Sequence, residues 1–459
     1  MEFFTIFFLL FLLFNFVFNN KGIITLPFKK QIPNLNGLSP KEVIEPNYLD
    51  NLITTEIRVG TEPQSIKLRI ELNSYLFYIA GSNTNSQIKF IQKNSTTYNK
   101  VETESHYFSD SKLNEAIFSS DYIYYEQNND EKYTTNFLLG IDTLKDKSGG
   151  LIGLNADNKS VQKYSKYNFI NELKKNKIIK DYYFTIKYND NNSGNLIIGD
   201  IPHNYDKNYN HYYFKDIYCE MHDFDFGWNL KFDSIYISDE KNSRDIKKVD
   251  GLYAYLNVEK SIIEGTTSYR TILLNYFMQE QINNKICFEV LDSENYYSYY
   301  CNEKVNISKV KNLYFYNKEL NFTFELTYKD LFYHNEYDGN YYFLIVFLKD
   351  DEMGYSSYYW KLGEPLFKKY QFIFNQNTKK IGLYTNFNDN ENNIKNENWW
   401  SKNKWYVILI ILLLILFSGL SVVLFLYIKN KPKRKLKANE LNEDYEYNSS
   451  NMPNDKLIN

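Results

Sequence analysis

The feature that most constrains this chain is an apolar run near its C-terminal end. Residues 405–428 carry no charged side chain over 24 positions, and a helix of that length crosses about 30 Å of hydrocarbon. Four aromatic side chains between residues 399 and 406 flank its front edge, and six cations follow between residues 429 and 437. The positive-inside rule places that basic segment in the cytosol. We therefore predict a transmembrane helix over 405–428, with a buried helix as the alternative.

A second apolar run lies at the N-terminal end. Phe3 to Phe18 is nearly all Phe, Leu, Ile and Val, which is short for a bilayer span but typical of a signal-peptide core. No basic residue precedes the run and no Ala-x-Ala site follows it, so an uncleaved anchor is the alternative. We predict a signal peptide over 1–20 and a single-pass type I membrane protein of the secretory pathway or cell surface. A juxtamembrane stalk (389–404) and a cytosolic tail (429–459) complete this topology.

Composition narrows the range of partners. The chain has 459 residues, a net charge of −3 and 43% hydrophobic residues, which suits a large globular core and gives no indication of a nucleic-acid partner. The five His residues are scattered without ligand spacing, so we expect neither a metal nor a cofactor. Five Asn-x-Ser/Thr sequons in the predicted lumenal part are candidate glycosylation sites: Asn94, Asn158, Asn191, Asn306 and Asn321.

Cysteine usage agrees with an oxidising compartment. The chain has three Cys residues, and Cys287 and Cys301 are separated by a hairpin-sized loop. We expect these two to form a disulfide in the lumen, which leaves Cys219 as the odd cysteine.

The pattern between Thr54 and Thr385 predicts an all-β fold. Short runs of Ile, Tyr, Phe and Leu are broken by Asn, Asp, Gly and Ser, and residues 66–70 and 231–237 alternate apolar and polar side chains as half-buried strands do. Residues 169–173 are the best candidate for a helix. Short strands without regularly alternating helices argue against a parallel βαβ sheet.

Four motifs in this region, in the correct order and at the correct separations, resemble those of pepsin-like aspartic proteases. They are Ile57-Arg-Val-Gly-Thr-Glu-Pro-Gln64, Gly149-Gly-Leu-Ile-Gly-Leu154, Ser193-Gly-Asn-Leu-Ile-Ile-Gly-Asp200 and Trp360-Lys-Leu-Gly-Glu-Pro-Leu-Phe367. The resemblance implies a bilobal β fold with a central cleft, an N-terminal lobe over 45–215 and a C-terminal lobe over 216–388. It also places the Cys287–Cys301 pair where the family has the disulfide of its C-terminal lobe. As scaffold, Gly153 and Gly363 are expected where one backbone passes close to another.

The residues that perform catalysis in that family are replaced. An aspartic protease needs two carboxylates about 3 Å apart that share one proton, and the family supplies each Asp from a loop of sequence Asp-Thr/Ser-Gly. The corresponding positions read Glu71-Leu72-Asn73 in the N-terminal lobe and Asn257-Val258-Glu259 in the C-terminal lobe. Asp, bracing hydroxyl and Gly are lost together in both loops. A different alignment, with Asp250 at the second site, would conflict with the Ser-Ile-Ile-x-Gly match at 261–265.

Glu71 has two interpretations. It is either a lone general base whose pKa is raised by burial, or a leftover polar residue that binds backbone N–H groups or water. Glu259 in the opposing loop is the only candidate for a second carboxylate. The flap motif of the family is missing, and Tyr107 is the nearest candidate for its tyrosine, with an ordinary strand residue as the alternative.

Three functions are compatible with this sequence. The first is a membrane-tethered pseudoprotease that binds a peptide or protein ligand in its cleft. The second is a divergent aspartic-type endopeptidase that uses Glu71 with Glu259 or another carboxylate, and the third is a structural surface glycoprotein. We expect no prosegment of ordinary length before Asn47, although Lys29-Lys30 is a candidate processing point.

Overall fold

The computed structural model describes twelve segments of the chain and two single positions. They are residues 22–31, 36–43, 53–108, 113–125, 131–143, 148–155, 162–190, 192–219, 227–238, 246–290, 296–349 and 359–385, with 421 and 426. Contacts divide the chain into two compact units, Met1–Phe387 and Asn388–Asn459. The predicted signal peptide (1–20) lies outside the described residues, as does the predicted span (405–428) apart from Ser421 and Leu426. Within the described part, no helix is both long and apolar enough to cross a bilayer.

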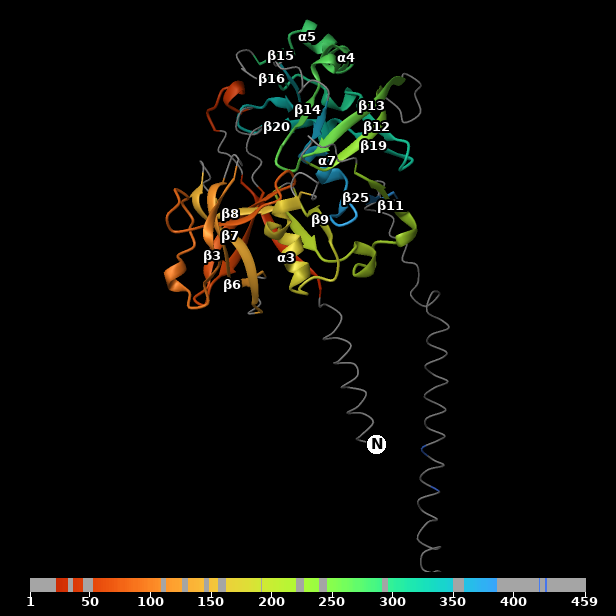
Figure 1. The fold of residues 1–459 in the computed structure, drawn as a ribbon. Coiled ribbons are helices and arrows are strands. Elements are labelled where there is room, and N and C mark those ends of the chain that lie inside the picture. Colours follow the sequence, from red (N-terminus) through yellow and green to blue (C-terminus); the bar gives the residue numbers. More distant parts are fainter. Residues whose placement is uncertain are drawn as a thin grey trace, which may run out of the picture. The chain divides into compact units, whose positions relative to one another are not determined.

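The largest element of the first unit is a sheet of thirteen strands (Figure 1). In spatial order they are β11 (Phe214–Tyr218), β25 (Lys380–Tyr384), β24 (Ile373–Asn375), β9 (Tyr183–Tyr188), β10 (Ser193–Ile198), β1 (Ile24–Lys30), β2 (Ile53–Val59), β3 (Gln64–Glu71), β8 (Gly150–Gly153), β4 (Phe77–Ala80), β7 (Tyr133–Thr143), β6 (Leu113–Tyr124) and β5 (Asn99–Tyr107). The last two strands of the chain, β24 and β25, therefore return to the sheet built mainly by its first half. This sheet joins the two halves of the sequence.

Two smaller sheets are built from the second half of the sequence. One has the order β16 (Tyr296–Tyr297), β22 (Ile345–Leu348), β14 (Ile263–Gly265), β23 (Trp360–Leu362), β13 (Ile246–Leu256), β12 (Asn229–Ser238), β18 (Asn312–Asn317) and β19 (Phe322–Leu326). The other has the order β15 (Cys287–Glu289), β17 (Tyr299–Cys301), β21 (Tyr341–Phe343) and β20 (Phe332–His334). The prediction of a mostly β protein is confirmed.

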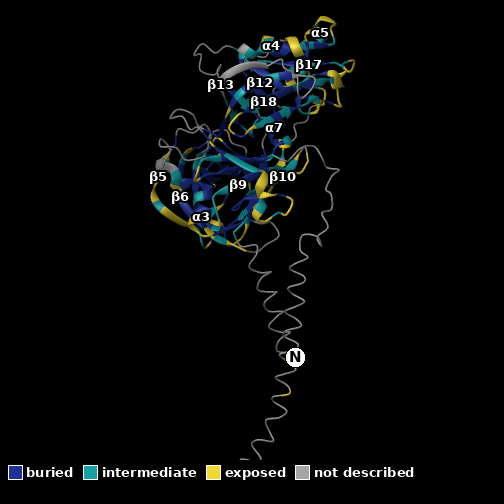
Figure 2. Cartoon of the chain, turned by 90° about the vertical axis from the view of Figure 1, so that its right-hand side faces the viewer, coloured by how far each residue is buried: buried dark blue, intermediate teal, exposed yellow. Residues whose placement is uncertain are grey.

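Alternating side chains explain the strands that the sequence predicted. In β3 the side chains of Ile66, Leu68 and Ile70 are almost fully buried, whereas the residues between them are more exposed. The tight turn before it contains Gly60, whose φ of +98° is a left-handed value that Gly adopts without strain. Figure 2 shows the same contrast across the molecule, with buried positions along the inner strands and exposed positions on β5.

The first strand was missed in the sequence. No strand is predicted over residues 24–30, and Lys29-Lys30 is a candidate processing point, yet β1 pairs with β10 on one side and β2 on the other. Ile24, Leu26 and Phe28 alternate with exposed residues and enter the core. The signal was present as an alternation of buried-type and exposed-type residues over positions 24–29.

Short helices lie between the strands. They are α3 (Phe169–Lys175), α4 (Thr267–Phe277), α5 (Gln279–Asn283), α6 (Tyr328–Leu331) and α7 (Glu364–Lys369), with the 3₁₀ turns η1 (Gln92–Asn94), η2 (Gln162–Tyr167), η3 (Pro202–Asn204), η4 (His211–Tyr213) and η5 (Ile307–Lys309). The predicted helix is confirmed in α3. Its N-cap is Asn168, whose side chain accepts from the N–H of Asn171 at 3.1 Å. The sequence analysis did not predict α4.

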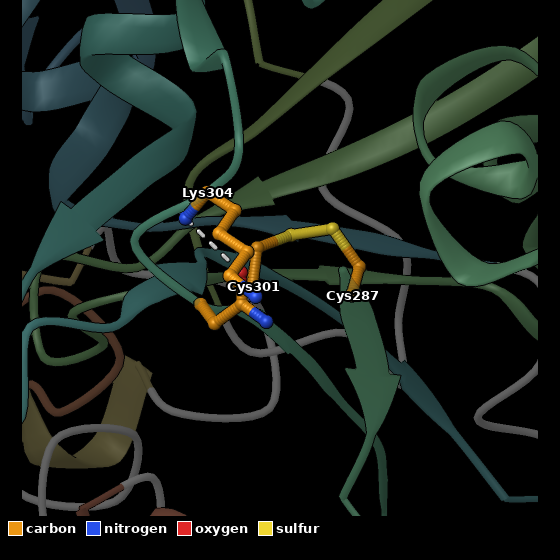
Figure 3. The surroundings of a disulfide bond; sticks show 4 residues. Cys287, Cys301 and Lys304 are labelled. Carbon is orange, nitrogen blue, oxygen red and sulfur yellow. Dashed lines mark hydrogen bonds between the residues drawn. A yellow bond between two sulfur atoms is a disulfide. The ribbon is translucent and has the colours of Figure 1, made fainter. Parts of the chain in front are cut away.

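The predicted disulfide between Cys287 and Cys301 is present (Figure 3). The two residues are direct partners in the antiparallel pair β15–β17, so the strand register itself brings them together. Cys219 is buried and is not part of a disulfide. The sequons Asn94, Asn306 and Asn321 are exposed, whereas Asn158 and Asn191 lie outside the described residues.

Candidate functional site

The first predicted catalytic position lies at the end of β3. The chain turns after Glu71 and returns as β4, while β8 runs between the two strands, parallel to β3 and antiparallel to β4. Glu71 is paired with Gly153 in this register. A Cβ atom on Gly153 would lie 2.5 Å from the carbonyl oxygen of Ser74 and 2.7 Å from that of Leu76. Only glycine fits at that distance.

The second predicted position follows β13 in the same way. The chain turns and returns as β14, while β23 runs between them, parallel to β13 and antiparallel to β14. Leu256 is paired with Leu362, so the next residues along are Asn257 and Gly363. A Cβ atom on Gly363 would lie 2.4 Å and 2.1 Å from the carbonyl oxygens of Lys260 and Ile262.

The two loops therefore repeat one geometry. In each loop the close carbonyls belong to the third and fifth residues after the predicted site, counted from Glu71 in one and from Asn257 in the other. The prediction that Gly153 and Gly363 lie where backbones pass closely is confirmed. Glu71 and Asn257 occupy equivalent backbone positions, which is a relation independent of any motif alignment.

The side chain of Glu71 forms an ion pair with Arg69. Its Oε1 accepts from Nη2 of Arg69, and the two residues are on the same face because they are two positions apart in one strand. The Glu71 side chain is 2% exposed. A guanidinium is always charged and matches a carboxylate well, so this oxygen is held by a permanent cation. Neither interpretation of Glu71 made from the sequence anticipated Arg69, although the spacing in a strand could have indicated it.

The side chain of Asn257 takes part in its own turn. Its Oδ1 accepts from the backbone N–H of Glu259 at 3.0 Å. The backbone N–H of Asn257 donates to the carbonyl of Leu362 at 3.0 Å. This is the local hydrogen bonding for which Asn is favoured in turns. An amide can donate a hydrogen bond, but it does not ionise and cannot exchange an acidic proton with a carboxylate as the second member of a dyad.

Glu259 connects the two loops. Its Oε1 accepts a hydrogen bond from the N–H of Leu72, the residue after Glu71, at 3.1 Å. At the positions where the family has bracing hydroxyls, Leu72 and Val258 are fully buried. A carboxylate from one loop thus binds the backbone of the other, a contact that the sequence analysis did not foresee.

Behind the second loop lies a buried carboxylate, Glu264, which sequence reasoning also missed. Nζ of Lys361 is 2.6 Å from its Oε2, and Nζ of Lys260 is 3.2 Å from its Oε1. Burial opposes ionisation of Glu264, but the charges of Lys361 and Lys260 outweigh burial and hold its pKa below the ordinary value. Lys361 is the direct partner of Glu264 across β14 and β23. The ion pair between Lys361 and Glu264 therefore links β23 to β14 next to the second loop.

The predicted flap residue is at the end of a hairpin. Tyr107 is the last residue of β5, is paired with Glu115 of β6, and is 72% exposed. The neighbouring Phe108 is buried in a separate apolar cluster that includes Leu76 of the first loop. Residues 109–112 lie outside the described part of the chain. The hairpin therefore contacts the cluster beside the site through Phe108.

The comparison with protein families agrees with this architecture. A sequence model described as eukaryotic aspartyl protease matches residues 53–385. The span covers both loops and all strands from β2 to β25. The chain belongs to the eukaryotic aspartyl protease family. A search of curated proteins found no match.

Proposed function

We propose that this chain is a membrane-anchored aspartic protease homologue that does not hydrolyse peptide bonds and binds an extended peptide or protein segment in the cleft expected of its family. One observation carries the proposal: equivalent backbone positions hold Glu71, paired with Arg69, and Asn257, which is a neutral amide. Hydrolysis requires a carboxylate at both positions, one of them protonated.

The chemistry of the two loops supports loss of activity in three ways. Asn257 has no carboxylate to share a proton. Oε1 of Glu71 is already engaged by the Arg69 guanidinium, so it is not directed at a partner carboxylate. Leu72 and Val258 have no hydroxyl to position a neighbouring carboxylate. The backbone of both loops is retained, so a peptide-binding surface can persist when catalytic activity is lost.

Two features support peptide binding. An extended peptide adds to a strand edge through main-chain hydrogen bonds and places alternate side chains in pockets. The strand β5 is the terminal strand of the large sheet, and next to it the cluster with Phe108, Leu76 and Tyr167 provides apolar side chains.

The test is a cleavage assay on the full-length chain in detergent at about pH 4, where aspartic dyads hold one shared proton. With denatured protein as substrate, we expect no cleavage sensitive to a pepstatin-type inhibitor, but retention of peptides on the immobilised chain. Inhibitor-sensitive cleavage would overturn the proposal.

A second candidate function is aspartic-type endopeptidase activity with Glu71 and Glu259 as the acidic pair. The contact between Glu259 and the Leu72 amide favours it, because that contact brings a carboxylate of the second loop to the first. Glu71→Gln and Glu259→Gln should each abolish cleavage if this candidate is correct. Glu319→Gln, at an exposed position, is the matched control.

The proposed anchoring and secretory route have their own test. If 1–20 is a signal peptide and 405–428 a span, the expressed chain stays with membranes after alkaline extraction. Glycosidase treatment should then increase its electrophoretic mobility, because Asn94, Asn306 and Asn321 are exposed sequons. Release of the chain by alkali would refute the anchor.

A further inference from the structure

Exposed tyrosines are concentrated in one short segment. Among the described residues, eleven large hydrophobic side chains are exposed, and four of them lie between positions 205 and 218. They are Tyr205, Tyr212, Tyr213 and Tyr218, which are 36%, 80%, 46% and 66% exposed. We call these four residues the tyrosine edge. Such a concentration of exposed apolar surface marks an interaction site more often than scattered single residues do.

Three of the four residues lie at the two ends of a terminal strand of the large sheet. Tyr218 ends β11, and Tyr212 and Tyr213 form the turn η4 just before it. β11 is the terminal strand in the sheet order and pairs only with β25 among the described strands (Figure 1). Proteins usually protect such strands with charge, bulges or a covering segment. Here aromatic side chains occupy the ends of the strand instead.

The chain leaves the protease-like unit at this edge. The N–H and Oγ1 of Thr385, the last described residue of that unit, donate to the carbonyl of Tyr213 at 2.9 Å and 3.2 Å. From there 20 residues lead to Trp405, where the predicted span begins. A chain of that length spans at most about 70 Å when fully extended. The last described residue of the protease-like unit thus lies beside the tyrosine edge.

The chemistry of the edge fits a lipid headgroup region. Tyrosine has an apolar ring and a polar hydroxyl, and it gathers at membrane–water interfaces for that reason. Nζ of Lys380 lies 4.8 Å from the ring centre of Tyr218. A hydrogen bond to Asp216, only partly opposed by burial, raises the pKa of Lys380, so this amine is charged at neutral pH. Lys380 is ion-paired with Asp216 at 3.2 Å, so the pair adds no net charge and the expected lipid contact depends on the tyrosine side chains.

We propose that the tyrosine edge lies on the phospholipid surface into which residues 405–428 insert, so that the protease-like unit is oriented on the membrane. The inference depends on the membrane anchoring proposed above. It predicts a fixed contact between this face and lipid, in addition to the tether.

The test uses the full-length chain in nanodiscs of phosphatidylcholine and phosphatidylserine. An environment-sensitive fluorophore is attached at Tyr212→Cys, and in a matched control at Tyr337→Cys, which is 65% exposed in another sheet region. The native cysteines are buried or disulfide-bonded. With nitroxide-labelled lipid we expect roughly a twofold or greater loss of fluorescence at position 212 and little at 337, since interfacial contact places the probe within about 10 Å of the headgroups.

A second variant adds Tyr213→Ser and Tyr218→Ser to the labelled Tyr212→Cys chain. Quenching should fall toward the level of the control, while the thermal unfolding midpoint shows that the fold is retained.

The outcomes separate the two proposals. If the chain does not elute with nanodiscs, both the anchoring and this inference fail. If it elutes with nanodiscs and positions 212 and 337 are quenched equally, this inference alone is overturned. A fluorescence change in detergent that grows with protein concentration indicates contact between two copies, and it also overturns the lipid assignment.

Discussion

The loops that follow β3 and β13 have the same backbone and different chemistry. Each loop leaves a strand, passes over a glycine of a central strand and returns, with close contacts at matching positions. In the first loop a carboxylate pairs with an arginine of its own strand. In the second an amide closes its own turn, and Glu259 reaches to the other loop.

The difference between the loops shows that the strand crossing and the catalytic chemistry depend on different residues. The crossing of strands depends on glycine and on register, because any Cβ at the crossing would overlap a carbonyl oxygen. Catalysis depends on side chains that the crossing does not require. Side chains can therefore change at both sites while the loops persist. Four substitutions test this comparison, in order of decreasing effect on stability.

Gly363→Ala is expected to have the largest effect. Its Cβ would lie 2.1 Å from the carbonyl oxygen of Ile262, a backbone atom that cannot move unless the loop opens. We expect a loss of about 3 kcal/mol or more in the free energy of unfolding, measured by denaturant titration. Gly153→Ala should be nearly as costly if the loops are equivalent. The control is Gly339→Asn, at a position with φ of +72° where an added Cβ would meet no atom within 4 Å beyond its chain neighbours. An equal loss of stability in this variant would contradict the explanation by close backbone contact.

Lys361→Ala should destabilise the second loop alone. It removes one of two cations from the buried Glu264, and Lys260 remains, so we expect a loss of about 2 kcal/mol at neutral pH. Because the pKa of Glu264 is lower in the folded chain than in the unfolded chain, its ionisation stabilises the fold above about pH 4.3. That stabilisation is lost as the pH falls through the folded pKa.

The difference between wild type and Lys361→Ala should therefore shrink in acid below about pH 4. Thermal unfolding at a series of pH values measures it, with the exposed Lys329 changed to Ala as control. A difference that stays constant with pH would mean that Glu264 is not the cause.

Asn257→Ala removes the acceptor for the N–H of Glu259 and should lower the free energy of unfolding by about 1 kcal/mol. Asn257→Asp keeps the acceptor and should have a smaller effect at neutral pH. Equal losses from both variants, measured by denaturant titration, would show that the turn does not depend on this hydrogen bond.

Glu259→Gln should have the smallest effect. It keeps an oxygen for the Leu72 amide and removes only the charge, so we expect about 0.5 kcal/mol or less. Glu259→Ala should be more costly because it leaves a backbone N–H without this acceptor. If the two variants have equal stability in thermal unfolding, the contact between the loops does not stabilise the fold.

The sequence by itself determined the class of fold and the scaffold of the loops. Alternating apolar residues predicted β3, and Gly153 and Gly363 predicted close backbone crossings, because these signals are local and depend on one residue type at one position. The Cys287–Cys301 pair was also accessible from the sequence, since a short separation limits the choice of partners. The order of the motifs was enough to predict that Glu71 and Asn257 occupy the positions of the two catalytic aspartates.

Only the tertiary structure decided what those replacement residues do. The bond from Leu72 to Glu259 joins residues 187 positions apart, and the return of β24 and β25 to the first sheet is equally distant in sequence. Contacts of that kind depend on how strands pair across the whole unit, and local propensity and periodicity do not encode them. The tyrosine edge has the same origin, because β11 becomes a terminal strand only through its pairing with β25, its one partner among the described strands.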